Sequence, residues 1–363
     1  MSSKREALKA EFLARHDLAD ASRFALAGDA STRAYERLHT PSGKTLIFMD
    51  QPPHAETEPC RPDFTPQQRA ASGYNAMARL AAGRVEAFVT TATHLKSLGL
   101  SAPEVIAFDA PNGLAVLEDL GDALYARLIG DGAAEDELYN AAVDALAVMH
   151  AQTPPSEMTC GDVTWPLLAY DDVALKTAGD LFIEWLPQFN TELSFSDEAA
   201  ARWEAIWAPI RKQGEADADV FCHRDYHAEN LIWLPEREGP ARVGLLDFQD
   251  AVRAHKVWDF SMLLHDARRD VSAEREAASL AHYFALRPEL DREEFMAAYN
   301  ALGTLNVSRI LGIFSRLVVR DGKPRYAAFM PRLWGYLDRT LNAPGMDAIK
   351  GWFDEYVPME ARA

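Results

Sequence analysis

Three polar residues in the second half of the chain have the types and the spacing that phosphoryl transfer requires. Asp225 and Asn230 lie in the segment His223-x-Asp225-x-x-x-x-Asn230, and Asp247 follows a later apolar run. Phosphoryl transfer needs a carboxylate that accepts a proton from the attacking hydroxyl, and hard oxygen ligands for the Mg²⁺ that bridges the ATP phosphates. We therefore expect Asp225 to be the base, and Asn230 and Asp247 to be the metal ligands.

Short apolar runs flank these three residues and can fix their positions. Val220 and Phe221 lead into the first polar loop, residues 231–233 follow it, and residues 243–246 lead to Asp247. Runs of this length and composition are typical of β-strands, and the Pro and Gly residues between the last two runs indicate a turn. A single acid in a surface loop is common, so the hypothesis rests on three suitable residues, each beside a predicted strand.

Length and composition restrict the remaining possibilities. A chain of 363 residues exceeds what one hydrophobic core normally organises, which predicts two lobes or domains. The net charge of −18 argues against a nucleic-acid partner, because such proteins carry basic surfaces. The three cysteines are widely separated, and we find no signal peptide and no apolar run long enough to span a membrane. We therefore expect a cytoplasmic protein without a membrane or nucleic-acid partner, monomeric by default.

The polar segments resemble those of known kinases. Residues 223–225 with Asn230 are similar to the catalytic loop of protein kinases, but residues 247–249 read Asp-Phe-Gln and lack the glycine of the Asp-Phe-Gly motif. Asp-Phe-Gln, with Asp259 later in Trp-Asp-Phe, is more similar to the aminoglycoside phosphotransferase and choline kinase superfamily. Members of that superfamily keep the protein-kinase fold and phosphorylate small molecules.

Within this superfamily the chain resembles the bacterial N-acetylmuramate/N-acetylglucosamine anomeric kinases. The matching segments are residues 28–35, 46–50, 117–121, the catalytic loop, 309–317 and 320–323. The resemblance implies an enzyme that uses ATP and Mg²⁺ to phosphorylate the anomeric hydroxyl of an amino sugar, in peptidoglycan recycling.

The resemblance also implies a fold and an order of sites along the chain. The expected fold is α+β and bilobal, like that of protein kinases. A small β-rich N-lobe over residues 1–120 would carry the nucleotide-covering loop and the hinge. A larger, mainly helical C-lobe over residues 121–363 would carry the catalytic loop, the metal site and the sugar-binding helices.

The candidate nucleotide contacts lie in two segments. In the loop Gly-Asp-Ala-Ser-Thr-Arg, we expect Ser31, Thr32 and Arg33 to contact the phosphates, since small residues let backbone N–H groups approach an anion. An ordinary hairpin turn has the same composition, so this expectation depends on the resemblance. The resemblance also implies that backbone groups of Glu118 and Leu120 contact adenine at the hinge between the lobes.

One position departs from the kinase pattern. In kinases the third strand carries a lysine that holds the α- and β-phosphates, whereas Met49 occupies that position here, on the same strand face as Ile47. Either Arg33 or Lys44 supplies the missing charge, or the chain is a nucleotide-binding pseudokinase. We expect Arg33 to do so, because a guanidinium can hold phosphate oxygens bidentately. Lys44 lies at the start of the strand and is expected to point to solvent.

Other assignments stay open. A kinase of an amino alcohol or an aminoglycoside would suit an acidic pocket. A metal-dependent hydrolase could use His223, Asp225, His227 and Asp247 as ligands, but Asn230 would then have no role.

Two further polar residues are expected to be structural. The resemblance implies that Asp259 caps the helix that begins near it and braces the catalytic loop. His150 ends a strongly periodic helix and is expected to be a core or capping histidine.

Overall fold

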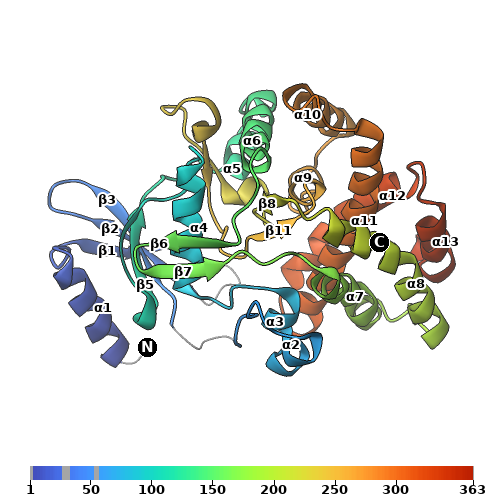
Figure 1. The fold of residues 1–363 in the computed structure, drawn as a ribbon, viewed down its shortest axis with the longest axis horizontal. Coiled ribbons are helices and arrows are strands. Elements are labelled where there is room, and N and C mark those ends of the chain that lie inside the picture. Colours follow the sequence, from blue (N-terminus) through green and yellow to red (C-terminus); the bar gives the residue numbers. More distant parts are fainter. Residues whose placement is uncertain (1–2, 27–32, 53–56, 363) are drawn as a thin grey trace. The chain divides into compact units, whose positions relative to one another are not determined.

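The computed structural model describes residues 3–26, 33–52 and 57–362 of the chain. Packing divides the chain into two compact units (Figure 1). The first comprises residues 1–124, 155–167 and 231–250, and the second comprises residues 125–154, 168–230 and 251–363. Asp225 and Asn230 thus belong to the second unit, and Asp247 belongs to the first. The lobe boundary at residue 120 stays a prediction, since packing assigns two later segments to the first unit.

An antiparallel sheet is the basis of the first unit. Its described strands follow the order β1-β2-β3-β5-β4. They are β1 (Ser22–Ala25), β2 (Ala34–His39), β3 (Thr45–Asp50), β4 (Val105–Asp109) and β5 (Leu114–Glu118). Successive side chains of a strand point to opposite faces, so Leu46 and Phe48 share one face of β3, and Ile47 and Met49 share the other.

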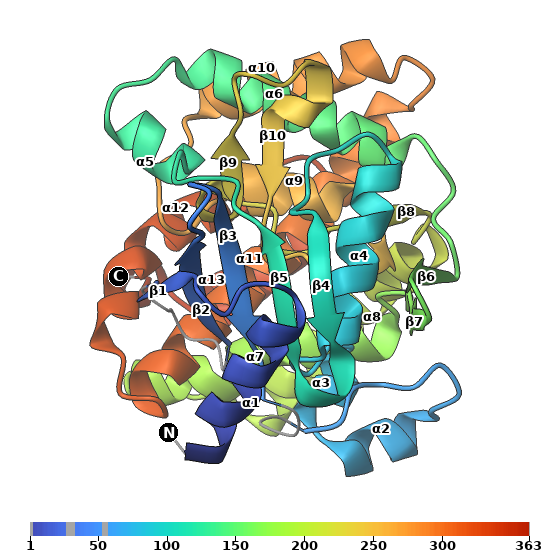
Figure 2. The same ribbon diagram turned by 90° about the vertical axis from the view of Figure 1, so that its left-hand side faces the viewer.

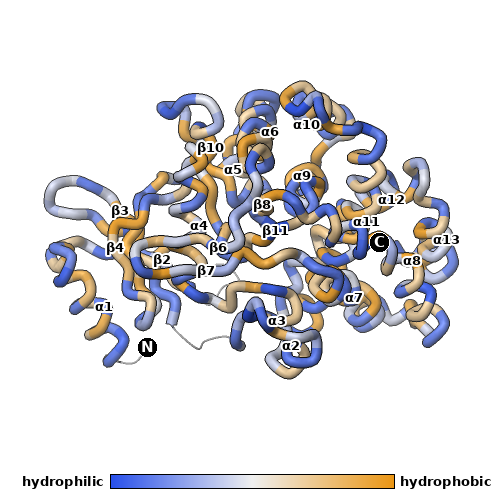
Figure 3. Tube along the Cα trace, in the orientation of Figure 1, coloured by the Kyte–Doolittle hydropathy of each residue, from blue (hydrophilic) through white to orange (hydrophobic). Residues whose placement is uncertain are grey.

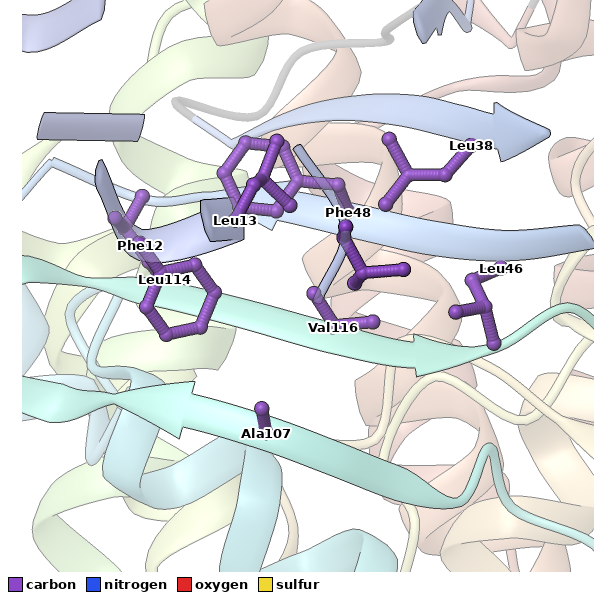
Figure 4. Packing of buried hydrophobic residues seen from close by; sticks show 9 residues of the cluster. Phe12, Leu13, Leu38, Leu46, Phe48, Ala107, Leu114 and Val116 are labelled. Atoms are coloured by element: carbon purple, nitrogen blue, oxygen red, sulfur yellow. The ribbon is translucent and has the colours of Figure 1, made fainter. Parts of the chain in front are cut away.

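Helix α1 (Ser3–Arg15) covers the face of the sheet that carries Phe48, as Figure 2 shows. The buried residues of this contact come from α1, the segment after it and four strands: Phe12, Leu13, Leu18, Leu38, Leu46, Phe48, Ala107, Leu114 and Val116 (Figure 4). Full burial of a large apolar side chain stabilises a fold by about 1.5–3 kcal/mol. Because α1 occupies this face, Met49 lies on the side of the sheet that α1 does not cover.

The other elements of the first unit include those that hold the segment around Asp247. Strands β9 (Leu231–Trp233) and β10 (Val243–Leu245) form an antiparallel hairpin, which confirms the two strands predicted there. Helix α4 (Val85–Ser97) packs Phe88 against Phe248, with ring centroids 4.8 Å apart. The remaining elements are α2 (Pro66–Ser72), α3 (Tyr74–Ala78), η1 (Ala110–Asn112), β6 (Glu157–Cys160), β7 (Val163–Pro166) and η3 (Gly239–Arg242).

The second unit is mainly helical and is built around α11 (Arg292–Val319). This helix packs against α7 (Asp172–Phe189), α9 (Val257–Leu264) and α12 (Met330–Leu341). At α7 the two backbones come close, because a Cβ at Gly312 would lie 2.4 Å from the carbonyl carbon of Leu181. Hydrophobic residues predominate in β8 and α9 (Figure 3). The other elements are α5 (Tyr125–Gly130), α6 (Glu135–His150), α8 (Asp197–Ala216), β8 (Val220–Cys222), η2 (Ala228–Asn230), β11 (Val252–Ala254), α10 (Ala273–Leu286), η4 (Pro324–Phe329), α13 (Asp347–Tyr356) and η5 (Met359–Ala361).

Among the described residues, α11 is the one helix whose length and composition would suit a membrane crossing. Its packing gives another explanation, since 67% of its apolar window is buried inside the protein, as expected for a core helix. A first unit based on a sheet and a second unit based on helices together confirm the predicted α+β class.

Candidate active site

The loop after β8 contains the candidate base and is held by one buried carboxylate. Asp259, fully buried in α9, accepts hydrogen bonds from the backbone N–H groups of His223 at 2.7 Å and of Arg224 at 2.8 Å. The Cys222 thiol donates to the same carboxylate at 3.2 Å. Burial raises the pKa of Asp259, while His223 and the hydrogen bonds act in the opposite direction. The predicted bracing role is confirmed, but the predicted capping role is wrong, because Lys256 is the N-cap residue and Asp259 lies inside the helix.

Backbone strain marks the residue before the candidate base. Arg224 has a φ of 79°, in the left-handed region that non-glycine residues rarely adopt. Such a conformation costs about 1–3 kcal/mol and persists only where its surroundings enforce it. Two contacts do so here: the N–H of Arg224 donates to Asp259, and its guanidinium lies 4.7 Å from the centre of the Tyr170 ring. The shape of this loop is therefore imposed by packing.

The candidate base and the candidate metal ligand of the second unit are connected directly. The Asn230 amide donates from Nδ2 to the carbonyl oxygen of Asp225 at 2.9 Å, and the N–H of His227 donates to the same oxygen at 3.1 Å. Both Asp225 and Asn230 are half-buried. Since Nδ2 is used within the loop, Oδ1 is the amide atom of Asn230 that can coordinate a cation.

In the first unit, Asp247 is the centre of a separate polar group. It follows β10 and has a φ of 61°, again in the left-handed region. The Arg33 guanidinium donates to Asp247 Oδ1 and, from Nη1, to Gln249 Oε1 at 2.5 Å. The amide of Gln249 donates from Nε2 to Asp247 Oδ1 at 3.2 Å. Asp250 accepts a hydrogen bond from the backbone N–H of Ala81 at 2.6 Å.

Arg33 is enclosed and faces acidic side chains. Its side chain is 11% exposed, whereas that of Asp247 is 38% exposed. Burial acts to lower the pKa of Arg33, but the negative charges of its surroundings, including Asp247 and Asp250, outweigh burial and raise that pKa. Arg33 is thus a fixed positive charge next to the candidate metal ligand of the first unit.

The structure describes some of the predicted nucleotide contacts and not others. Ser31 and Thr32 lie outside the described residues. The backbone N–H of Glu118 donates to the carbonyl oxygen of Glu104 at 2.8 Å, and Glu118 pairs with Leu46 of β3. Leu120 is 9% exposed and lies two residues after the end of β5.

The two candidate replacements for the strand lysine are placed differently. Met49 is fully buried on β3 and pairs with Tyr35 on one side and Ala115 on the other. Lys44 is exposed just before β3, as the sequence predicts. Of the two cations, Arg33 is therefore the one that contacts the candidate metal ligand.

Sequence reasoning missed two supporting residues. Gln249 is 6% exposed. The sequence does mark this residue, because it stands where protein kinases have the glycine of Asp-Phe-Gly. Asp266 is 2% exposed and accepts hydrogen bonds from the backbone N–H groups of Ala228 at 3.3 Å and Arg268 at 2.8 Å. It supports the turn that leads to Asn230, and no motif in the sequence marks it.

The structure describes the residues that the hydrolase alternative would use. In the described part of the chain, no three His, Cys, Asp or Glu side chains form a group that could hold a metal ion. His227 instead lies with its Nε2 atom 3.3 Å from Asn230 Nδ2 and 3.5 Å from Arg268 Nη1.

Comparisons with known proteins agree with these features. The sequence matches the phosphotransferase enzyme family over residues 24–296. An N-acetylmuramate/N-acetylglucosamine kinase of Caulobacter vibrioides is 64% identical over 362 residues, which cover 100% of this chain and 99% of the relative. A kinase of the same name from Pseudomonas aeruginosa is 31% identical over 86% of this chain and 82% of its own.

A solved structure supports the fold independently. The choline/ethanolamine kinase family protein of Mesorhizobium loti aligns with a TM-score of 0.56, over 96% of this chain and 98% of that chain. The identity is 14%, so this likeness concerns the fold alone. The predicted bilobal, kinase-like α+β fold is confirmed.

Proposed function

The chain belongs to the phosphotransferase enzyme family, and we propose that it transfers the γ-phosphoryl group of ATP to the anomeric hydroxyl of N-acetylmuramate or N-acetylglucosamine. The observation that carries this proposal is the 64% identity, over the whole chain, to the Caulobacter vibrioides kinase of these two sugars. The resulting sugar 1-phosphate would re-enter cell-wall synthesis, and the enzyme would act in the cytoplasm. By default, the enzyme would act as a monomer.

The proposed chemistry assigns one role to each residue of the catalytic loop. Asp225 takes the proton of the anomeric hydroxyl while that oxygen forms its bond to the γ-phosphorus and the bond to the leaving oxygen of ADP breaks. Asn230 and Asp247 would hold Mg²⁺, which would neutralise charge on the phosphate oxygens. Support for the loop assignment comes from the hydrogen bond between Asn230 and the carbonyl oxygen of Asp225, because it keeps the two residues in a fixed relation.

Nucleotide binding is assigned to the first unit. Arg33 would neutralise phosphate charge in place of the strand lysine, and its contact with Asp247 supports this role. Ser31 and Thr32 would supply further phosphate contacts. The Glu118 carbonyl and the Leu120 N–H would contact adenine.

A panel of acceptors assayed for ADP release tests the proposal. N-acetylmuramate, N-acetylglucosamine, choline and an aminoglycoside are each supplied with Mg·ATP, and ADP is measured against a control without acceptor. Release that requires an amino sugar, with a product that carries phosphate at carbon 1, is the expected result. Release that requires an amine would make the enzyme a kinase of another small molecule. Met49 motivates one more candidate, a pseudokinase, for which ATP would bind and no acceptor would release ADP.

A further inference from the structure

Three residues of the first unit form one hydrogen-bonded group around a cation. The Arg33 guanidinium donates to a carboxylate oxygen of Asp247 and to the amide oxygen of Gln249, at 2.5 Å for the latter. Gln249 also donates to Asp247 Oδ1 at 3.2 Å and to Asp250 Oδ2 at 3.4 Å. Gln249 is 6% exposed, so its orientation is fixed by these contacts.

The oxygens that hold this guanidinium are of the kind that Mg²⁺ prefers. Hard divalent cations bind carboxylate and amide oxygens. Asp247 presents a carboxylate oxygen and Gln249 an amide oxygen, and both accept from the Arg33 guanidinium. The residues present therefore fit a metal ion. The left-handed backbone at Asp247, with a φ of 61°, is a further mark of a constrained functional position.

Arg33 and a divalent ion cannot both hold Asp247 at full strength. Two cations that share one carboxylate repel each other, and the repulsion is strong where the site is mostly enclosed, as the 11% exposure of Arg33 shows. We propose that Arg33 and Mg²⁺ are alternative partners of Asp247 and Gln249, and that the phosphates of ATP take over the guanidinium when the metal takes the carboxylate. This inference rests on the proposed function, in which Asp247 is a metal ligand and Arg33 a phosphate ligand.

The exchange of Arg33 for Mg²⁺ at Asp247 makes the affinity for the metal ion depend on nucleotide. Without nucleotide, a metal ion must displace Arg33 from Asp247, and the guanidinium loses its hydrogen bonds to Asp247 and Gln249. With nucleotide, phosphate oxygens replace those partners, so metal and nucleotide bind together. Arg33 thus makes tight metal binding depend on ATP.

Mn²⁺ binding to the nucleotide-free protein, followed by electron paramagnetic resonance, is the test. The variants are Arg33→Ala and Arg33→Lys, and each is also made in a protein that carries Asp247→Asn. The difference in Mn²⁺ binding with and without Asp247→Asn gives the ions that bind through Asp247. Arg23→Ala is the matched control. Arg23 also forms an enclosed ion pair in the first unit, with Nε 2.5 Å from Glu36 Oε2, but this pair does not involve Asp247.

We expect Arg33→Ala to bind the Asp247-dependent Mn²⁺ at least about tenfold more tightly than the wild type, since it removes a charged hydrogen-bonded competitor. Arg33→Lys should lie between the two, and Arg23→Ala should match the wild type. With a non-hydrolysable ATP analogue present, the order should reverse, because Arg33→Ala no longer has the phosphate contact.

The outcomes separate this inference from the proposed function. If Asp247→Asn abolishes a Mn²⁺ site but Arg33→Ala leaves its affinity unchanged or lower, the exchange is wrong while the metal assignment stands. If Arg33→Ala tightens Mn²⁺ binding in a protein that phosphorylates no amino sugar, the exchange stands and the substrate assignment fails. If Asp247→Asn changes no Mn²⁺ binding in any background, the exchange is overturned together with its premise.

Discussion

The Asp259 carboxylate gives a direct test of how the loop before Asp225 is held. Asp259→Asn keeps the side-chain volume but replaces one acceptor oxygen by an NH₂ group, which would face the backbone N–H of His223 or of Arg224. Losing one hydrogen bond to a buried charged acceptor costs about 1.5–3 kcal/mol. Part of this cost is offset, because burial raises the pKa of Asp259 and the neutral amide avoids burying a charge. We expect a net loss of about 1–2 kcal/mol in the free energy of unfolding.

The same substitution should affect catalysis through geometry. The N–H of Arg224 and its left-handed φ of 79° depend on the contact with Asp259. When that contact weakens, the strained residue can relax, and Asp225 next to it moves. A displacement of about 1 Å in a reacting group costs on the order of 10²-fold in rate. We therefore expect kcat to fall by about 10- to 100-fold, with little change in the KM for ATP.

Denaturant unfolding and sugar-dependent ADP release measure these two effects on the same samples. Cys222→Ala is the control, since it keeps both oxygens of Asp259 and removes one buried sulfur that is a weak donor; it should change unfolding by about 1 kcal/mol, with kcat nearly unchanged. Asp259→Ala, which removes both acceptor oxygens, should be more severe than Asp259→Asn in both assays. An Asp259→Asn variant with wild-type kcat would refute the reasoning, because the loop would then keep its shape without this carboxylate.

Three further outcomes follow from the assignments. Asp225→Asn should lower turnover by at least ~10²-fold while Mg·ATP still binds, and near-normal turnover would remove Asp225 as the base. Asp247→Ala should weaken Mg²⁺-dependent nucleotide binding, measured by calorimetry, and unchanged binding would exclude it as a ligand. Burial lowers the pKa of His150 to about 3, so below pH ~6.5 the unfolded chain takes up a proton that the folded chain does not. The wild type should therefore lose about 1.2 kcal/mol more stability than His150→Gln between pH ~7 and pH ~5.5, and equal losses would contradict the buried neutral state.

Local sequence patterns were sufficient to predict the elements around the site. The apolar runs before and after the first polar loop are β8 and β9, and the run before Asp247 is β10. These predictions succeed because each strand is short, apolar and bounded by turn residues, so that its conformation is determined by its own residues. His150 is 4% exposed and hydrogen-bonded to Tyr283 at 2.9 Å, which confirms the predicted core position.

Contacts across long stretches of sequence were harder to predict. The hydrogen bond from Arg33 to Asp247 joins residues separated by 214 positions, and no periodicity or turn signal carries information over that distance. Asp259 illustrates the same limit on a smaller scale. An aspartate near the start of a helix is usually a cap, but this one is turned to buried N–H groups of a distant loop, 35 and 36 positions away.

The burial of Met49 explains why a cation next to Asp247 is found at the start of β2 and not on β3. A lysine at position 49 would bury an ammonium group between Tyr35 and Ala115, which is costly unless a carboxylate pairs with it. A methionine at position 49 avoids this cost and fills the same space with an unbranched apolar side chain. In the phosphate role that we propose for Arg33, the positive charge is carried by a residue just before β2 and not by a lysine inside β3. At that position the Arg33 side chain can change partners.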